Sequence, residues 1–162
     1  MKSKAEERYL ADGLDELERT LHHLCYSANK SATISQNLSD ATEDELGQIE
    51  AFTSRFARVV DLISKRVLRS LDRFEFYDAG TLLDVANRAE KRGLIHTVDW
   101  LRELKDMHNQ IAHDYAGDRL PEILAYCREE LPRLLEVCQR IQIYARTLLG
   151  NGSPHTELQG LQ

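Results

Sequence analysis

The stretch IEAFTSRFARVVDLISKRVLRSLDRF, residues 49–74, repeats a large apolar residue at every third or fourth position. This spacing aligns the apolar side chains on one face of an α-helix for about seven turns. The sequence therefore predicts one long amphipathic helix as the longest core element, with a buried face made of Ile49, Phe52, Phe56, Val59, Ile63, Val67, Leu71 and Phe74.

Upstream of this helix, residues from about 4 to 30 carry a second apolar seam at steps of four and three. Its members are Leu10, Leu14, Leu17, Leu21, Leu24 and Ala28. A polar connector follows over residues 31–40. Thr42 with Glu45 three residues later then forms a capping-box pattern. We therefore expect a first long helix, a loop, and a second helix that begins after Thr42.

Downstream of residue 74, residues 78–81 break the apolar pattern. A short helix is predicted next, and Gly93 is suited to stop it because helices often end at a glycine. A final helix is expected from Pro121 to about Leu149. Pro132 is expected to break or restart that helix, since a proline inside a helix costs ~3 kcal/mol.

Between these two elements the apolar spacing predicts a helix from Val98 to Tyr115. Thr97 or His96 is suited to cap its beginning. Four long helices, one short helix and short polar connectors indicate an all-α protein, an antiparallel bundle of four to five helices.

The composition of the 162-residue chain agrees with this class. Hydrophobic residues make up 42% and charged residues 30%, with only 8 glycines and 3 prolines, which suits a solvated helical bundle better than a disordered or turn-rich chain. The length fits a single domain, expected over residues 1–149. The remaining residues, 150–162, are polar and are expected to form a mobile tail.

The formal net charge of −6 argues against a protein that holds nucleic acid through a general basic surface. Any contact with RNA would have to be local. The three cysteines, Cys25, Cys127 and Cys138, are far apart and lack a C-x-x-C spacing, so they are expected to be reduced packing residues of a cytoplasmic protein. Neither a signal peptide nor a membrane-spanning stretch is expected.

The long helix also carries cations away from its apolar face, at Arg55, Arg58, Lys65 and Arg69. One interpretation is a solvated face, which is the usual role of such charges. The other is a strip that faces RNA or a partner.

Residues 108–115, HNQIAHDY, crowd reactive polar side chains near the end of the helix predicted from Val98. At about 100° per residue, one polar stripe combines Arg102, Asp106, Asn109 and His113. His108 lies about 140° away from His113 and fills a slot in the apolar face. A site that uses both histidines therefore needs a distorted helix end or a second subunit, and the alternative for His108 is a packing role.

Metal-free RNA cleavage needs a base for the 2′-hydroxyl, an acid for the leaving oxygen, and donors for the charged phosphate. His113 suits the acid or base role, and Asn109 can donate to a phosphate oxygen. A zinc site is the rival chemistry, with His108, His113 and either Asp114 or Asp106. The spacing of the two histidines disfavours it, because ligands on one helical face are usually four residues apart.

The run Ile111-Ala112-His113-Asp114-Tyr115 resembles the signature of the HEPN-domain, HepT-like ribonuclease toxins, in which an arginine, a polar residue, a histidine and then a tyrosine follow one another. The resemblance is strongest over residues 93–144. One position departs from the pattern, since His108 stands where the family has arginine.

This resemblance implies a HEPN-like bundle that works as the toxin of a toxin–antitoxin pair, a metal-independent endoribonuclease without a cofactor. Such proteins are homodimers with a minimal nucleotidyltransferase antitoxin as partner, and RNA would bind in a local cleft. By position, Tyr115 would receive adenylate groups from the antitoxin. Arg102 and Asp106, as members of the polar stripe, are the candidates for contact with RNA or the partner.

The histidine at 108 leaves three outcomes open: a weaker, pH-dependent nuclease with His108 as arginine surrogate, a nuclease that recruits Arg102 or Lys105, or a silent relative. The alternative function is a non-catalytic HEPN binding module that works with a separate nucleotidyltransferase. A helical scaffold without either activity is the third class.

Overall fold

The computed structural model describes residues 3–150, and every regular element in that range is helical. The expected all-α class is therefore confirmed. The expected mobile tail falls almost entirely on residues 151–162, which lie outside the described residues. The elements in chain order are α1 (Lys4–Ser31), α2 (Glu43–Leu62), the π-helical turn η1 (Ile63–Val67), α3 (Leu68–Phe74), α4 (Leu82–Lys91), α5 (Val98–His113) and α6 (Leu120–Leu148).

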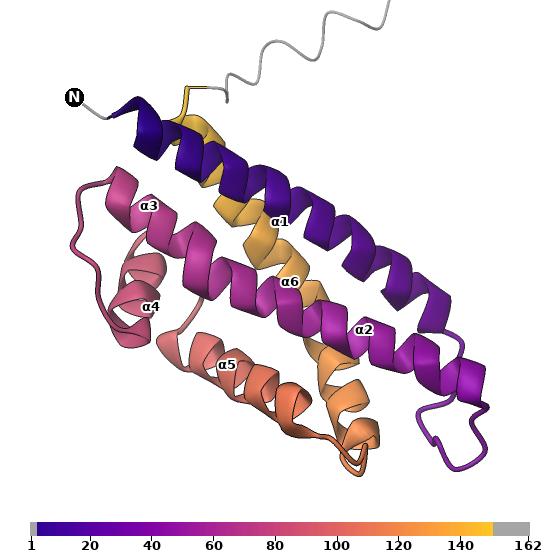
Figure 1. Ribbon diagram of the computed structural model, residues 1–162. Helices are drawn as coiled ribbons and strands as arrows, with labels where there is room; N and C mark the ends of the chain where they lie inside the picture. Colours follow the sequence, from indigo (N-terminus) through magenta and orange to yellow (C-terminus); the bar gives the residue numbers. More distant parts are fainter. Residues whose placement is uncertain (1–2, 151–162) are drawn as a thin grey trace, which may run out of the picture.

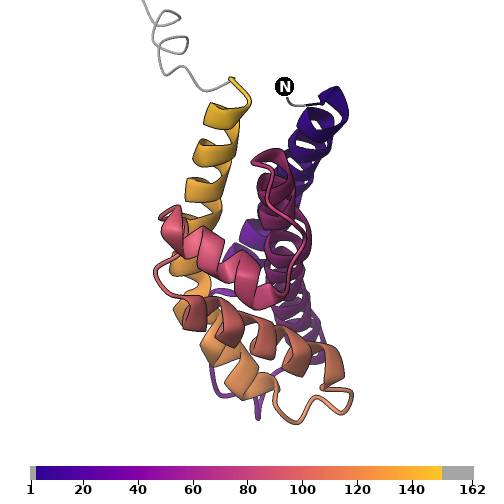
Figure 2. The same cartoon turned by 90° about the vertical axis from the view of Figure 1, so that its left-hand side faces the viewer.

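The helices form a bundle around one long rod. In Figure 1, α2, η1 and α3 continue into one another, and α1 lies antiparallel beside them. Helix α5 packs on α2 and runs antiparallel to it, while the short α4 packs on α3. Figure 2 shows α6 on the other side of the bundle from α1. This is the expected antiparallel arrangement of four long rods and one short helix.

Side chains near the helix ends account for where several helices begin. Thr42 accepts a hydrogen bond from the Glu45 amide, and the Glu45 carboxylate accepts one from the Thr42 amide, which confirms the predicted capping box. Thr97, rather than His96, caps α5 by accepting a hydrogen bond from the Trp100 amide. Local hydrogen bonds therefore fix where both helices begin, which is why the sequence pattern could predict these positions.

Gly93 ends the short helix as predicted. It has a positive φ of 75°, which glycine adopts without strain. The amide of Leu94 donates to the carbonyl of Ala89 and the amide of Gly93 to that of Glu90, a Schellman motif that satisfies the last carbonyls of α4.

The long central helix is not uniformly α-helical, unlike the prediction. At η1 the Leu68 amide donates to the Ile63 carbonyl, five residues back, so one extra residue is inserted into the helical repeat. The hydroxyl of Ser64 also bonds to the carbonyl of Val60. The insertion lets Ile63, Val67 and Leu68 all be fully buried, and periodicity in the sequence does not reveal it.

The expectation that Pro132 breaks the last helix was wrong. Helix α6 continues from Leu120 to Leu148 with Pro132 inside it. Proline removes one amide donor from the helix, but residues on both sides of it, including Cys127 and Leu134, are fully buried against the bundle. Tertiary packing therefore holds the helix through the proline.

The end of α5 also differs from the prediction. The helix ends at His113, with Asp114 as its C-cap, and Tyr115 lies in the turn that follows. Tyr115 is 88% exposed, so it does not close the apolar face of the helix. Asp114 and Tyr115 are therefore outside the helix, and helical periodicity does not determine the direction of their side chains.

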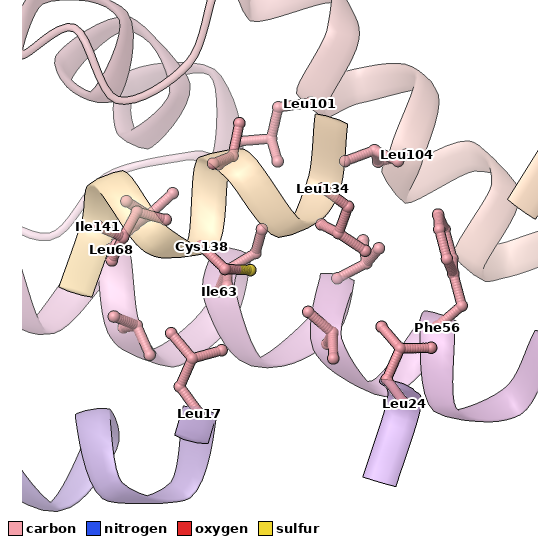
Figure 3. Packing of buried hydrophobic residues seen from close by; sticks show 14 of the residues in the cluster. Leu17, Leu24, Phe56, Ile63, Leu68, Leu101, Leu104, Leu134, Cys138 and Ile141 are labelled. Carbon is pink, nitrogen blue, oxygen red and sulfur yellow. The ribbon is translucent and has the colours of Figure 1, made fainter. Parts of the chain in front are cut away.

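One hydrophobic core receives side chains from every helix. In Figure 3, Leu17 and Leu24 of α1, Ile63 of the central rod and Leu101 of α5 converge with Cys138 of α6. All three cysteines are free thiols, with Cys127 and Cys138 buried and Cys25 half-buried. None of the helices in the described part of the chain is long and apolar enough to cross a membrane.

Candidate functional site

Helix α5 carries most of the candidate residues and is fixed by two hydrogen bonds near its beginning and by two buried leucines. The amide of Val98 donates to Glu90 Oε2 at 2.9 Å, which links α5 to α4. The indole Nε1 of Trp100 donates to Glu130 Oε2 of α6 at 2.8 Å. Leu101 and Leu104 are fully buried in the core. The rotation of α5 about its axis is therefore set, and with it the direction of each polar side chain.

The polar stripe predicted on α5 faces solvent. All four of its members are exposed, namely Arg102, Asp106, Asn109 and His113. None of the four contributes to an ion pair in the described part of the chain. The stripe can therefore meet a ligand or a partner without first breaking a salt bridge.

His108 lies on another side of α5, where it meets α2. Its Nε2 is 3.5 Å from Asp61 Oδ1, and its Nδ1 is 3.3 Å from the side-chain oxygen of Asn109. The side chain is 21% exposed, between the core and the surface. Both ring nitrogens thus face oxygen acceptors, and only an imidazolium can donate from both.

Asp61 collects a second and a third cation. Its Oδ1 is 3.0 Å from Lys65 Nζ and 3.2 Å from Lys105 Nζ. Partial burial by itself would raise the pKa of the Asp61 carboxyl, but hydrogen bonds and charge attraction from Lys65 and Lys105 outweigh it and hold that pKa below its usual value. One carboxylate is therefore surrounded by three basic side chains, and the two lysines alone already leave a local excess of positive charge.

The C-terminal end of α5 forms a separate corner. His113 Nδ1 is 3.4 Å from the hydroxyl of Tyr115, and the two rings meet edge to face with centroids 6.1 Å apart. Asp114 Oδ1 accepts the amide of Arg119, and Gly117 supplies the positive φ that the turn needs. The corner therefore presents a histidine, a phenol and the amide of Asn109 one helical turn earlier, all exposed.

Within one chain the two motif histidines do not share a site. Helix α5 is regular to its end at His113, so no local distortion brings His108 to the polar stripe. His108 has Asp61 and Asn109 as neighbours, whereas His113 has Tyr115. A site that uses both would need a second copy of the chain.

Asp61 is the residue that sequence reasoning missed. It sits on the long helix at neither a core position nor the predicted cationic strip, and its partners Lys105 and His108 are more than forty positions away. The one sequence signal was the Asp61–Lys65 spacing of four residues, which commonly forms an ion pair on a helix.

The predicted cationic strip is not one surface. The guanidinium of Arg55 binds the Ser27 hydroxyl and the His23 carbonyl of α1, and that of Arg69 binds the Gly80 carbonyl at 2.7 Å. Of the four, only Arg58 and Lys65 are exposed, and Lys65 pairs with Asp61. Two of the four cations therefore serve to join elements of the fold.

The residues of the rival zinc site do not gather. His108 and His113 have different neighbours, and no group of three or more His, Cys, Asp or Glu side chains able to hold a metal ion occurs among residues 3–150. The residues of the site thus offer acid–base and hydrogen-bonding groups.

No family model, no curated protein and no solved structure matches this chain. What the fold and the site define is an all-helical bundle with a histidine–tyrosine corner at the end of α5 and a basic cluster around Asp61.

Proposed function

We propose that this chain is a HEPN-type, HepT-like toxin component that acts on RNA as a homodimer. The observation that carries the proposal is the exposed contact between His113 and Tyr115 at the end of α5. An exposed histidine beside a phenol can exchange protons with a substrate, and neither side chain is needed in the core.

In the proposed reaction, His113 removes the proton of a ribose 2′-hydroxyl, whose oxygen then attacks the adjacent phosphorus. The bond from phosphorus to the 5′ oxygen breaks, that oxygen takes a proton from water, and the protonated His113 returns its proton to the solvent. This leaves a cyclic phosphate on one product and a 5′-hydroxyl on the other. Asn109 donates to a phosphate oxygen, and protonated His108 or Lys105 of the second copy in the homodimer adds positive charge near the phosphate.

The proposed partner is a minimal nucleotidyltransferase that transfers adenylate to Tyr115. The exposure of Tyr115 supports this role, because a modifying enzyme must reach this side chain. An adenylate at this position would add negative charge and bulk beside His113. Tyr115→Phe should then remain unmodified when incubated with the partner and ATP, as measured by intact mass.

A second candidate is the non-catalytic binding module. It is favoured by the contact of His108 with Asp61, since a carboxylate at that place competes with phosphate for the charge of His108. In that case the polar stripe of α5 binds the nucleotidyltransferase, and no RNA is cleaved.

RNA cleavage by the purified, partner-free chain tests the proposal, measured from about pH 5.5 to about pH 8 because histidine titrates in that range. His113→Ala should abolish cleavage, and His108→Arg should strengthen it above the wild type at the upper end of this range. His96→Ala is the matched control, because His96 is also exposed but precedes α5.

Cleavage that survives in His113→Ala would reject the catalytic assignment. Absence of cleavage in every variant, combined with binding of a nucleotidyltransferase that is lost when the α5 stripe is mutated, would establish the binding module instead.

A further inference from the structure

A cavity of about 150 Å³ lies at the opposite end of the bundle from the histidine–tyrosine corner. It is bounded by the first turns of α1, by η1 and α3, and by the loop that leads to α4, all at the upper left of Figure 1, whereas the turn after α5 is at the lower right. Its lining combines three cations, two carboxylates and two tyrosines with two small residues of the loop, namely Tyr9, Lys65, Arg69, Asp72, Arg73, Tyr77, Asp78, Ala79 and Gly80.

Aromatic rings and guanidinium groups are stacked around this cavity. The guanidinium carbons of Arg66 and Arg73 each lie 5.0 Å from the centroid of the Tyr9 ring. Arg88 and Arg92 lie over Tyr77 at 4.9 and 5.4 Å. Both tyrosines are nevertheless exposed, Tyr77 by 50%. Each ring is therefore already stacked with two guanidinium groups, and a ligand in the cavity can reach the exposed parts of these stacks.

Most of the arginines here are held by the protein itself. Arg66 pairs with Glu16, while Arg88 and Arg92 both pair with the buried carboxylate of Asp72. Arg69 binds the Gly80 carbonyl. These contacts fix the walls of the cavity and neutralise Asp72.

Arg73 differs from its neighbours. Its guanidinium stacks on Tyr9, and no carboxylate contacts it in the part of the chain that the structure describes. Lys65, on the same rim, is 64% exposed although it also reaches Asp61. In a chain with a net charge of −6, these two side chains leave positive charge available for an anion.

The backbone beside the cavity is strained. Phe76 has a φ of 65°, in the left-handed region that disfavours bulky residues, and its ring is 67% exposed. The amides of Phe76 and Tyr77 donate to the carbonyls of Arg73 and Asp72, the same helix-end motif that Gly93 forms after α4, so the end of α3 holds Phe76 in this conformation. This helix end also places Tyr77 beside the cavity.

We propose that this cavity binds one nucleotide unit, with the base against the tyrosine and guanidinium planes and the phosphate on Arg73 and Lys65. Unpaired bases stack on aromatic and arginine side chains in this way, and the phosphate requires a cation. The proposal rests on the proposed function for the source of that nucleotide, which is a single-stranded RNA.

Lys65 connects the cavity with the motif helix. Its Nζ contacts Asp61 Oδ1, the same atom that Lys105 and His108 approach. Basic side chains therefore follow one another from Arg73 through Lys65 to Lys105 on α5. The side chain of Lys65 is 64% exposed and that of Lys105 only 14%, so Lys65 is the cation that an RNA strand anchored in the cavity can meet on its way toward α5.

Binding of a 5′-fluorescein-labelled, single-stranded RNA of about ten nucleotides to the full chain tests this inference by fluorescence anisotropy. All variants carry His113→Ala, so that the RNA stays intact. Arg73→Gln should weaken binding by about tenfold and reduce its salt dependence by about one phosphate contact. Tyr77→Leu should weaken binding without changing the salt dependence.

Arg140→Gln is the matched control, since it makes the same charge change at an α6 residue paired only with Glu136 one turn away. Arg73→Lys keeps the charge but loses the planar group, and should restore the salt dependence while leaving the affinity below that of the parent. Circular dichroism verifies that each variant is folded. The substitutions of Arg73 should leave the fold intact, because Arg73 is exposed and has no ion pair among the described residues.

Equal RNA affinity of Arg73→Gln and Arg140→Gln, or no RNA and no AMP binding by the parent, would overturn the inference. A parallel titration with AMP separates the sources: AMP binding that requires Arg73, with no tighter binding of RNA, identifies a free nucleotide as the ligand. Cleavage of RNA at an unchanged KM by Arg73→Gln with an intact His113 would reject the cavity and leave the proposed function standing.

Discussion

The Nε2 of His108 lies 3.5 Å from Oδ1 of Asp61, across the interface between α5 and α2. Position 108 of the motif therefore belongs to a contact between two helices and not to the exposed stripe that carries His113. Any basic side chain at this position meets a carboxylate already shared with Lys65 and Lys105. The interactions of residue 108 thus depend on a carboxylate of another helix.

Asp61→Asn should lower the free energy of unfolding by about 0.5–1 kcal/mol at neutral pH, as is typical of partly exposed ion pairs. The cause is loss of the charge that Lys65, Lys105 and His108 share. Urea denaturation of the two proteins measures the difference.

The pH dependence of that difference follows from the Asp61 pKa, which is below its usual value of 3.8. A carboxyl whose pKa is lowered by folding stabilises the folded state at pH values above its usual pKa. This stabilisation is lost as the pH falls through the pKa of the folded state. The gap between Asp61→Asn and the wild type should therefore close below about pH 3.8. Asp106→Asn, an exposed residue of the α5 stripe, should show no such gap, and a gap that widens in acid would contradict the assignment.

Pro132→Ala should stabilise the protein by about 1–2 kcal/mol. Helix α6 is continuous through this exposed position, so alanine restores an amide donor without losing a buried contact. An interior proline is ~3 kcal/mol worse than alanine, and the stiffer unfolded chain returns about 1 kcal/mol of that. Urea denaturation checks this, with Gln139→Ala, also exposed in α6, expected to change little. A destabilised Pro132→Ala would show that the ring makes contacts the helix needs.

Phe76→Gly should raise the free energy of unfolding by about 0.5–1 kcal/mol, because glycine adopts a positive φ without strain. Little burial is lost, since the ring is mostly exposed. Gly93→Ala should lower the free energy of unfolding, because the φ of Gly93 is also positive and disfavours a residue with a Cβ. The added Cβ meets no atom within 4 Å, so backbone strain is the cause. Thermal unfolding of both variants distinguishes the two signs. Equal destabilisation of both would mean that the Phe76 ring contributes more than its exposure indicates.

The thiols should differ in reactivity. Burial raises the pKa of both Cys127 and Cys138 to about 12, so neither forms a thiolate near neutral pH. Cys25 is only half-buried. Ellman's reagent at about pH 8 should therefore label one thiol rapidly in the native protein and three after unfolding in denaturant. Cys25→Ser should abolish the rapid phase, and two rapid thiols in the native protein would refute this account.

Local patterns predicted the helices well because their causes are local. The Thr42 cap and the Gly93 stop depend on hydrogen bonds between residues three to five positions apart, which spacing reveals. The exposed stripe on α5 also followed from helical periodicity. The π-helical turn and the continuous helix through Pro132 could not be predicted in this way. Both irregularities are unfavourable in an isolated helix, and burial against other helices compensates for their cost.

By itself, the sequence determined the helical class, the approximate helix bounds and which face of α5 is polar, because these depend on the α-helical repeat and on side-chain caps. Only the tertiary structure decided that His108 contacts Asp61, and that Tyr9, Tyr77 and Arg73 line the same cavity. These residues come from separate helices and loops, and their distances are set by how the helices pack around the common core.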